Sequence, residues 1–313
     1  MKLYVAGHTG LVGTACVRHF SQRADVQLLT VPRSTLDLTD SRAVHHWLSS
    51  RRPEAIILAA GRVGGIAANA QFPAEFLYEN AMIEANVIHH AWETGITRLL
   101  NFGSSCMYPK QCAQPMRVEQ LMTGPVEPTS QPYAVAKWLG VSLCASYRQQ
   151  YGVRFISAIP ATVYGPGDSF DPDSAHVLSA LIKKFYEAKE LRVRDIVLWG
   201  SGHAVREFLY ADDLAAACDV LLERYDDLLP VNIGSGDSCT IRELAHLIAE
   251  VVGFDGTVRW NEARPDGAPI KQLSSDVIRT HGWAPRTSLR QGIERTYRWF
   301  LEHEAKESSC ASL

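Results

Sequence analysis

The stretch KLYVAGHTGLVGTACVRHF, residues 2–20, decides the fold. A short apolar run leads into a loop with glycines at positions 7, 10 and 13, and a segment of helical length follows. Glycines in such a strand, loop and helix permit a tight turn and let the helix N-terminus face a pyrophosphate. The spacing is GxxGxxG, not GxGxxG, and glycines also end strands for purely structural reasons. The order of the elements nevertheless predicts dinucleotide binding through Gly7, His8, Thr9, Gly10, Leu11, Val12 and Gly13.

Short apolar runs alternate with helical patterns over the first two thirds of the chain. The runs are continuously apolar, which predicts parallel strands buried on both faces of a sheet. Segments of helical length lie between them. We therefore predict an α/β protein with a Rossmann-type doubly wound parallel sheet. The expected strands are 2–7, 26–31, 55–61, 98–104 and 153–160.

The pattern changes after residue 165 to a turn-rich connection, shorter strands and shorter helices. We predict a dinucleotide-binding domain over 1–165 and a smaller α/β substrate lobe over 166–304. A helix beginning at YADDL and a strand in LPVNIGSG look like returns to the first domain near 205–235, so the lobes are expected to interleave. The polar end, 305–313, predicts a disordered tail.

Composition and charge restrict the classes of molecule that the protein is expected to bind. Of 313 residues, 46% are hydrophobic and 21% are charged, as in ordinary globular chains. The net charge of −3 leaves no basic field for nucleic acid. The N-terminal apolar run is too short for a signal peptide or a membrane span, so no membrane partner is expected.

Seven cysteines without a C-x-x-C pair argue against a disulfide framework and a zinc site, which predicts no bound metal and a cytoplasmic location.

The segment after the second expected strand bears on the choice of dinucleotide. An NAD site has an acidic residue there for the ribose hydroxyls, whereas this chain has Arg33 and Ser34. Arg33 suits a 2′-phosphate and so predicts NADP, although a solvated loop residue would look the same. Asp37, followed by Leu38, either faces the adenine or caps the next helix. The sequence leaves both roles open.

Tyr133 and Lys137 lie four residues apart on one face of an expected helix. The ammonium can lower the pKa of the phenol, which then exchanges a proton with a carbonyl oxygen. A tyrosine and a lysine occur at this spacing by chance in many unrelated sequences. Here the glycine loop precedes it, and Ser104 and Ser105 end the fourth expected strand, where a hydroxyl can bind the same carbonyl. Together these features resemble the extended, nucleotide-sugar type of short-chain dehydrogenase/reductase.

Five further segments match the pattern of one family within this class. They are RVGGI at 62–66, GSSCMYP at 103–109, PYAVAK at 132–137, WGSG at 199–202 and REFL at 206–209. The chain closely resembles the GDP-L-fucose synthase family, the GDP-4-keto-6-deoxy-D-mannose 3,5-epimerase/4-reductases, from the first strand to about residue 303. The resemblance implies an NADPH-dependent enzyme with a GDP-sugar substrate.

The chemistry of that family sets the demands on the site. A 4-keto group acidifies the protons on C3 and C5, so inversion needs one group to remove a proton and another to return one to the opposite face. Cys and His suit this near neutral pH, and the resemblance implies Cys106 and His176, with a buried structural Cys and His as the alternatives. It further implies that Tyr133 gives a proton to the C4 oxygen, with Ser104 and Lys137 assisting. Reduction before epimerisation would give a dead-end sugar.

The resemblance also implies binding residues. Contacts to the cofactor are expected from Ser105, Lys137, Pro160, Ala161, Thr162, Val163 and His176. Contacts to the diphosphate and base of the substrate are expected from Lys184, Trp199, Arg206 and Asp266.

Two positions depart from the family pattern. Thr9 stands where bacterial members carry a basic residue, so Arg33 must carry more of the NADP preference. Thr162 replaces an Asn on the substrate side, which leaves open another GDP-linked 4-keto sugar, of the colitose or 6-deoxy-heptose type. A reductase with an inert Cys/His pair and a non-catalytic cofactor-binding module also remain open.

The resemblance implies a homodimer built on a four-helix bundle. The helices expected to form it lie near 73–93 and 132–151 of each subunit. Their apolar residues could equally face the chain's own core: Phe76, Leu77, Met82 and Ile83.

Overall fold

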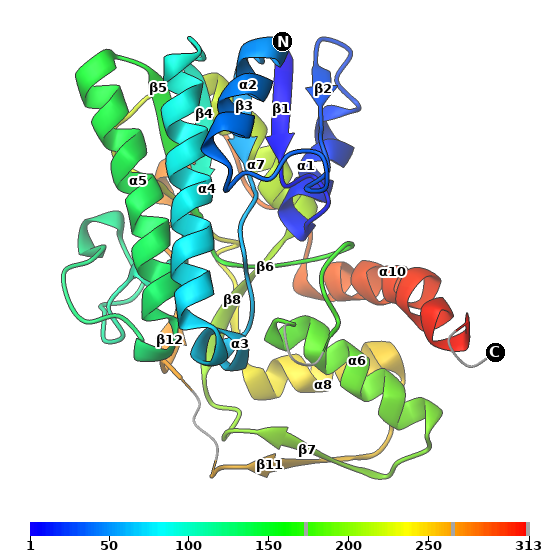
Figure 1. Ribbon diagram of the computed structural model, residues 1–313. Helices are drawn as coiled ribbons and strands as arrows, with labels where there is room; N and C mark the ends of the chain where they lie inside the picture. The colour runs from blue at the N-terminus through cyan, green and yellow to red at the C-terminus, as the bar shows by residue number, and fades with distance from the viewer. Residues whose placement is uncertain (172–174, 264–266, 311–313) are drawn as a thin grey trace.

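The computed structural model describes residues 1–171, 175–263 and 267–310. Six parallel strands form the central sheet, in the order β2-β1-β3-β4-β5-β9 (Figure 1). They are β1 (Lys2–Ala6), β2 (Gln27–Leu29), β3 (Ala55–Leu58), β4 (Arg98–Phe102), β5 (Arg154–Pro160) and β9 (Val231–Ile233). The strand order reverses between β1 and β3, and the predicted Rossmann-type doubly wound sheet is confirmed.

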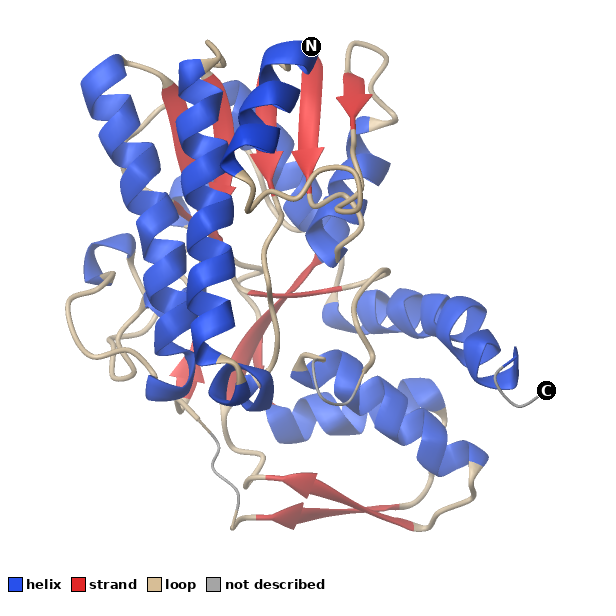
Figure 2. Ribbon diagram, in the orientation of Figure 1, coloured by secondary structure: helices blue, strands red, loops and turns tan. Residues whose placement is uncertain are grey.

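Helices cover both faces of this sheet (Figure 2). The helices that surround it are α1 (Leu11–Phe20), α2 (Ser41–Arg51), α4 (Pro73–Glu93), α5 (Gln131–Tyr151) and α7 (Ala211–Arg224). α1 and α7 pack on each other, whereas α4 packs on α2 and α5. None of the described helices is long and apolar enough to cross a membrane.

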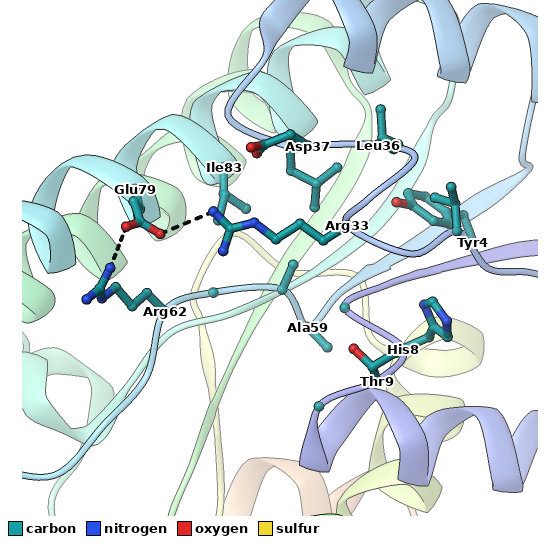
Figure 3. A pocket seen from close by; sticks show the side chains of 16 residues that line it. Tyr4, His8, Thr9, Arg33, Leu36, Asp37, Ala59, Arg62, Glu79 and Ile83 are labelled. Carbon is teal, nitrogen blue, oxygen red and sulfur yellow. Dashed lines mark hydrogen bonds and ion pairs between the residues drawn. The ribbon is translucent and has the colours of Figure 1, made fainter. Parts of the chain in front are cut away.

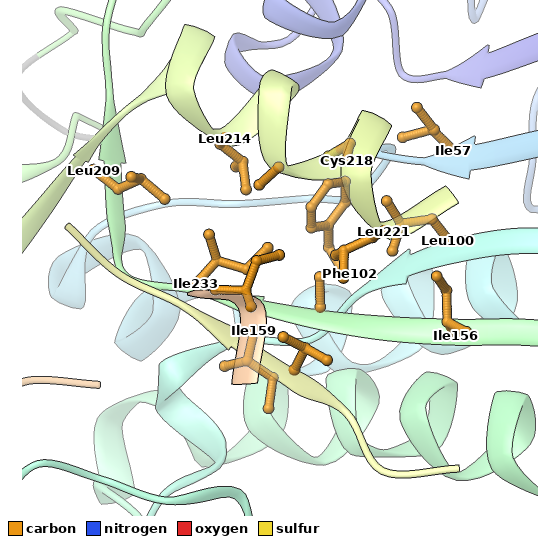
Figure 4. Packing of buried hydrophobic residues seen from close by; sticks show 14 of the residues in the cluster. Ile57, Leu100, Phe102, Ile156, Ile159, Leu209, Leu214, Cys218, Leu221 and Ile233 are labelled. Carbon is orange, nitrogen blue, oxygen red and sulfur yellow. The ribbon is translucent and has the colours of Figure 1, made fainter. Parts of the chain in front are cut away.

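Successive residues of the central strands enter different clusters of the core. Ile57, Leu100 and Ile156 pack with α7 (Figure 4), whereas Ile56 and Leu99 pack in the cluster beneath α2 and α4. A strand covered on both faces therefore needs apolar side chains at every position, which is why these strands are continuously apolar.

The rest of the chain forms a second α/β region below the sheet (Figure 1). In it β8 pairs with β6 and β12 in parallel and with β10 in antiparallel orientation, and β7 pairs with β11. Its strands are β6 (Thr162–Tyr164), β7 (Asp195–Trp199), β8 (Val205–Tyr210), β10 (Ser238–Thr240), β11 (Thr257–Asn261) and β12 (Ile270–Lys271). Its helices are α6 (Val177–Glu190), α8 (Ile241–Val252) and α10 (Leu289–Cys310), with a separate core cluster between them.

Short helices fill the connections. They are α3 (Ile66–Gln71), α9 (Asp276–Thr280), and the single 3-10 turns η1 (Ser105–Met107), η2 (Val118–Gln120) and η3 (Pro128–Ser130). After β8 the chain returns to the first region through α7 and β9, which pairs with β5. The domain boundaries at 165 and 304 stay a prediction. α10 continues to Cys310, so residues 305–310 of the expected tail are helical, in keeping with the high helix propensity of the AKE sequence there.

Candidate active site

The glycine loop closes tightly over the first strand. Gly7 has φ +82°, and a Cβ there would lie 2.6 Å from the backbone nitrogen of Ala60. A Cβ at Gly13 would lie 2.0 Å from the Gly7 carbonyl oxygen. Gly10 precedes α1 and its backbone N–H donates to the Gly7 carbonyl at 3.1 Å. No side chain caps α1, so the amide groups of its first turn are left for an anion.

This loop lies at the carboxyl end of β1, next to β3, where the strand order reverses. Open α/β sheets bind their ligands in the crevice at such a point. The absence of side chains at Gly7 and Gly13 and the uncapped helix together fit a dinucleotide pyrophosphate.

A cavity of about 220 Å³ opens beside the loop (Figure 3). Seven residues expected from the sequence line it: Gly7, His8, Thr9, Gly10, Arg33, Asp37 and Leu38. The sequence reasoning missed the remaining lining residues: Tyr4, Val31, Leu36, Ala59, Ala60, Gly61, Arg62, Glu79 and Ile83. The residues after β3 could have been predicted from the run AIILAAG at 55–61, which ends in a glycine as the first strand does. Glu79 and Ile83 come from α4, and no pattern in the sequence marks them as residues of this site.

The other residues expected to bind the cofactor are not among those that line this cavity. Leu11 and Val12 pack on the hydrophobic core, and the backbone of Gly13 packs closely against Gly7. Pro160 ends β5, and Thr162 and Val163 belong to β6. The remaining members of this set are Ser34, Ser105, Lys137, Ala161 and His176.

Charged groups are arranged across the cavity. The Arg33 side chain is 73% exposed, and its guanidinium lies 3.6 Å from the Glu79 carboxylate, which also accepts a hydrogen bond from Arg62 at 2.6 Å (Figure 3). Asp37 accepts from the backbone N–H and hydroxyl of Thr39, which hold the pKa of Asp37 below its usual range, and Arg33 lowers it further. An exposed guanidinium is thus available for a phosphate.

The two open roles of Asp37 are distinguished by the turn that follows it. The N-cap of α2 is Asp40, whose carboxylate accepts from the Ala43 N–H at 3.0 Å. Asp37 instead lines the cavity. It therefore faces the site and is not the cap of α2.

Three predicted catalytic side chains come together at the carboxyl end of β4. Ser104 follows the strand, and its hydroxyl accepts from the Cys106 N–H at 3.2 Å. Ser104 also lies close enough to the Tyr133 phenol to lower its pKa. Cys106 is half-buried in η1, which packs on α5, and the Tyr133 ring meets Phe76 edge-on at 6.2 Å between centroids.

The expected effect of Lys137 on Tyr133 is not what the structure has. Lys137 is 5% exposed, and its ammonium donates to the carboxylate of Glu84 in α4. Burial raises the pKa of Tyr133, nearby Cys106 and Glu84 raise it further, and Ser104 lowers it. Burial of the phenol is the largest of these causes, and the Lys137 ammonium is held by the Glu84 carboxylate.

His176 lies at the junction of the two regions. It is the N-cap residue of α6, and a Cβ at Gly65 would lie 3.3 Å from the carbonyl oxygen of its neighbour Ala175. The turn carrying His176 therefore packs on the glycine pair that follows β3. Burial raises the pKa of Asp168, a hydrogen bond from Ser179 lowers it, and His176 lowers it further.

The residues expected on the substrate side lie in the second region. The Lys184 ammonium donates to the Val197 carbonyl at 2.5 Å, and burial lowers the pKa of Lys184. Trp199, at the end of β7, is 66% exposed. Arg206 in β8 donates to the Val205 carbonyl at 2.8 Å and approaches the loop at Gly267. Asp266 lies outside the described residues.

A glycine loop at the switch point of a parallel sheet, with Ser104 beside Tyr133, defines the class of short-chain dehydrogenases/reductases. Residues 3–234 match the NAD dependent epimerase/dehydratase family. The chain is 47% identical to the GDP-L-fucose synthase of Escherichia coli (strain K12), with 97% of each chain covered. It is also 47% identical to GDP-L-fucose synthase 1 of Arabidopsis thaliana, with 96% of this chain and 94% of that one covered. The chain therefore belongs to the NAD dependent epimerase/dehydratase family and, within it, to the GDP-L-fucose synthase family.

A solved relative shares the whole architecture. The GDP-mannoheptose C4 reductase from Campylobacter jejuni, with NADP bound, superposes with a TM-score of 0.88. It is 32% identical, and the match covers 96% of this chain and 98% of that one.

Proposed function

We propose that this protein converts GDP-4-keto-6-deoxy-D-mannose to GDP-L-fucose, by inversion at C3 and C5 followed by reduction at C4. The observation that carries the proposal is the full-length 47% identity to GDP-L-fucose synthases, in a chain whose Ser104, Cys106 and Tyr133 converge. The identity to the GDP-mannoheptose reductase is lower, at 32%. The chemistry is therefore that of an NADP-dependent epimerase/reductase.

The residues present fit NADPH. The loop of Gly7, Gly10 and Gly13 accommodates the pyrophosphate, and Arg33 offers its guanidinium to the 2′-phosphate. Bound NADPH supplies the hydride that reduces C4. We assign the remaining cofactor contacts near the sugar to these residues: Ser105, Lys137, Pro160, Ala161, Thr162, Val163 and His176.

Protons are moved by the chain's own side chains. Cys106 and His176 remove and return the protons at C3 and C5, which are labile only while C4 is a ketone. Tyr133 then protonates the C4 oxygen. Its raised pKa keeps the phenol protonated at neutral pH, which suits a proton donor. Ser104 holds the same oxygen by a second hydrogen bond.

The second region offers the groups for the GDP part of the substrate. Lys184 and Arg206 supply two positive charges for two phosphates, and exposed Trp199 offers a ring face for the base. Asp266 belongs to the same proposed set by its sequence motif.

The proposal is tested by incubation of the protein with GDP-4-keto-6-deoxy-D-mannose and NADPH in deuterated water. We expect GDP-L-fucose with deuterium at C3 and C5, identified by NMR. A C4-reduced product without deuterium would instead mean a reductase with an inert Cys/His pair. No turnover with any GDP-linked 4-keto sugar would favour a cofactor-binding module.

A second candidate substrate is a GDP-linked 4-keto sugar of the colitose or 6-deoxy-heptose type. It is favoured by Thr162 in β6, whose hydroxyl replaces the longer amide of the family pattern, and by the likeness to a GDP-mannoheptose C4 reductase. The ratio of kcat/KM for the two sugars decides between them.

We also propose a homodimer through α4 and α5. Phe76 and Ile83 are buried in the chain's own core, whereas Tyr78 and Leu77 of α4 are exposed. Exposed apolar residues continue on α5: Val135, Leu139 and Tyr151. An apolar face of this kind suits a four-helix bundle between two copies. Sedimentation at micromolar concentration is expected to give twice the chain mass.

A cytoplasmic location is part of the proposal. The six cysteines whose side chains the structure describes are free, as in a reducing compartment. Fractionation of cells from the source organism tests it.

A further inference from the structure

We propose that His45, His89, His90 and Glu93 form a binding site for a divalent transition-metal ion such as Zn²⁺, which joins α2 to α4. These residues are not among those that line the cofactor cavity. The prediction of no bound metal rested on the cysteines, whereas the ligands here are three histidines and a glutamate. The inference is independent of the proposed function, because no group assigned to the reaction takes part in it.

Three of the four side chains converge at the C-terminal end of α4. His89, His90 and Glu93 each present one ligand atom, and these atoms lie within 4.8 Å of one another. The Nδ1 atom of His90 lies 2.7 Å from the Oε2 atom of Glu93. His90 is 9% exposed, whereas the Glu93 side chain is 45% exposed. An ion can therefore enter from solvent on the side of Glu93.

The fourth side chain comes from α2. The Nε2 atom of His45 lies 3.7 Å from the same oxygen of Glu93, and the rings of His45 and His90 are 5.3 Å apart between centroids. Zinc bonds of about 2.0–2.2 Å in a tetrahedron place neighbouring ligand atoms roughly 3.3–3.6 Å apart. The measured separations of 2.7 and 3.7 Å lie on either side of this range. Small side-chain rotations therefore suffice to admit the ion.

Two hydroxyl groups hold the rings of His89 and His90 from behind. The Ser41 hydroxyl lies 2.8 Å from Nε2 of His90, and the Tyr147 hydroxyl lies 2.6 Å from Nδ1 of His89. A metal-binding histidine usually donates its other ring N–H to an oxygen in this way. The hydroxyls thus leave Nδ1 of His90, on the side of Glu93, and Nε2 of His89 as the ligand atoms.

The carboxylate of Glu93 is in the form that binds a cation. The hydrogen bond from His90 is the largest cause that lowers the pKa of Glu93, partial loss of water opposes it, and His45, His90 and His89 lower it further through their charges. Glu93 is therefore ionised at neutral pH. Imidazoles suit Zn²⁺ and its neighbours in the transition series, whereas Ca²⁺ and Mg²⁺ take oxygen ligands.

The two helices are fixed against each other before any ion binds. The amide of Asn86, a buried residue of α4, donates to the carbonyls of Leu38 and Thr39 at 2.9 and 3.0 Å, just ahead of α2. Ligands on elements that already pack together need little further ordering. Because the site exists only in the folded chain, a bound ion stabilises the fold.

The test measures zinc binding by the full chain without an added histidine tag, by equilibrium dialysis against zinc chloride. We expect one zinc ion per chain, and a thermal unfolding midpoint that rises by a few degrees with zinc and returns after chelation. His45→Ala and Glu93→Gln each remove an exposed ligand and are expected to weaken zinc binding by about tenfold or more. His46→Ala, at an exposed neighbour on the same helix, is the matched control and is expected to bind zinc like the wild type.

The active site also carries zinc-binding side chains, so Cys106→Ser is measured beside these variants and is expected to retain its zinc. Zinc that is lost in Cys106→Ser but kept in His45→Ala and Glu93→Gln would overturn the proposal. So would a wild type that binds no zinc at micromolar concentration, or a His46→Ala protein that is weakened as much as His45→Ala. Unfolding midpoints without zinc, expected to be nearly equal because the replaced residues are exposed, show that each variant is folded.

Discussion

Replacement of Tyr133 by phenylalanine is expected to lower kcat for C4 reduction by about 10²- to 10⁴-fold, the usual contribution of a positioned general acid. The ring and its edge-on contact with Phe76 are kept, so folding and substrate binding should change little. What is lost is the hydroxyl that we propose as the proton donor to the C4 oxygen. The substrate-dependent oxidation of NADPH, followed by absorbance, measures the effect.

The same variant separates the two halves of the reaction. Because Cys106 and His176 are untouched, Tyr133→Phe is expected to keep exchanging deuterium from solvent into C3 and C5. Tyr147→Phe is the matched control, since Tyr147 lies on the same helix and bonds His89 instead of the site. A Tyr133→Phe protein that reduces C4 within a factor of about ten of the wild type would disprove the assignment.

Cys106→Ser is expected to abolish deuterium incorporation at C3 and C5 and to leave C4 reduction measurable. A serine hydroxyl fits the space of the thiol but is a far weaker acid, and loss of a general base of this kind lowers the rate by about 10²- to 10⁴-fold. Reduction then outpaces inversion. The expected product is the unlabelled C4-reduced sugar, identified by NMR.

The control for this variant lies six residues further along the chain. Cys112 is also half-buried, and burial raises its pKa, which makes it a poor base near neutral pH. Cys112→Ser should give doubly labelled GDP-L-fucose like the wild type. The role of Cys106 is refuted if Cys106→Ser yields that same labelled product at an unreduced rate.

Local sequence was sufficient wherever the function depends on the backbone of one short segment. The loop around Gly7 and Gly13 is recognisable because a side chain at either position would collide with backbone close by, so only glycine satisfies the geometry. The buried strands are recognisable because a sheet covered on both faces needs apolar residues throughout. Fold class and the mouth of the cofactor site therefore follow from residue type and spacing.

Contacts between segments far apart in the sequence could not be predicted from local patterns. Lys137 and Glu84 are separated by 53 residues, and a lone glutamate in a helix carries no mark of its partner. The spacing of Tyr133 and Lys137 suggested a direct effect of the ammonium on the phenol, yet the pKa of a buried group depends on every charge packed around it. Likewise, Arg33 is visible as a basic residue after β2, but its neighbour Glu79 comes from α4.

The sequence by itself determined the parallel α/β architecture and the glycine loop, because each follows from the local pattern of one segment. Only the tertiary structure decided which charges meet. It placed Glu84 against Lys137 in a space that Gly140 leaves open, and it brought Ser104 of the β4 end close to Tyr133 of α5. The physical reason is that burial and pairing, which set protonation, are properties of the packed interior and not of any one segment.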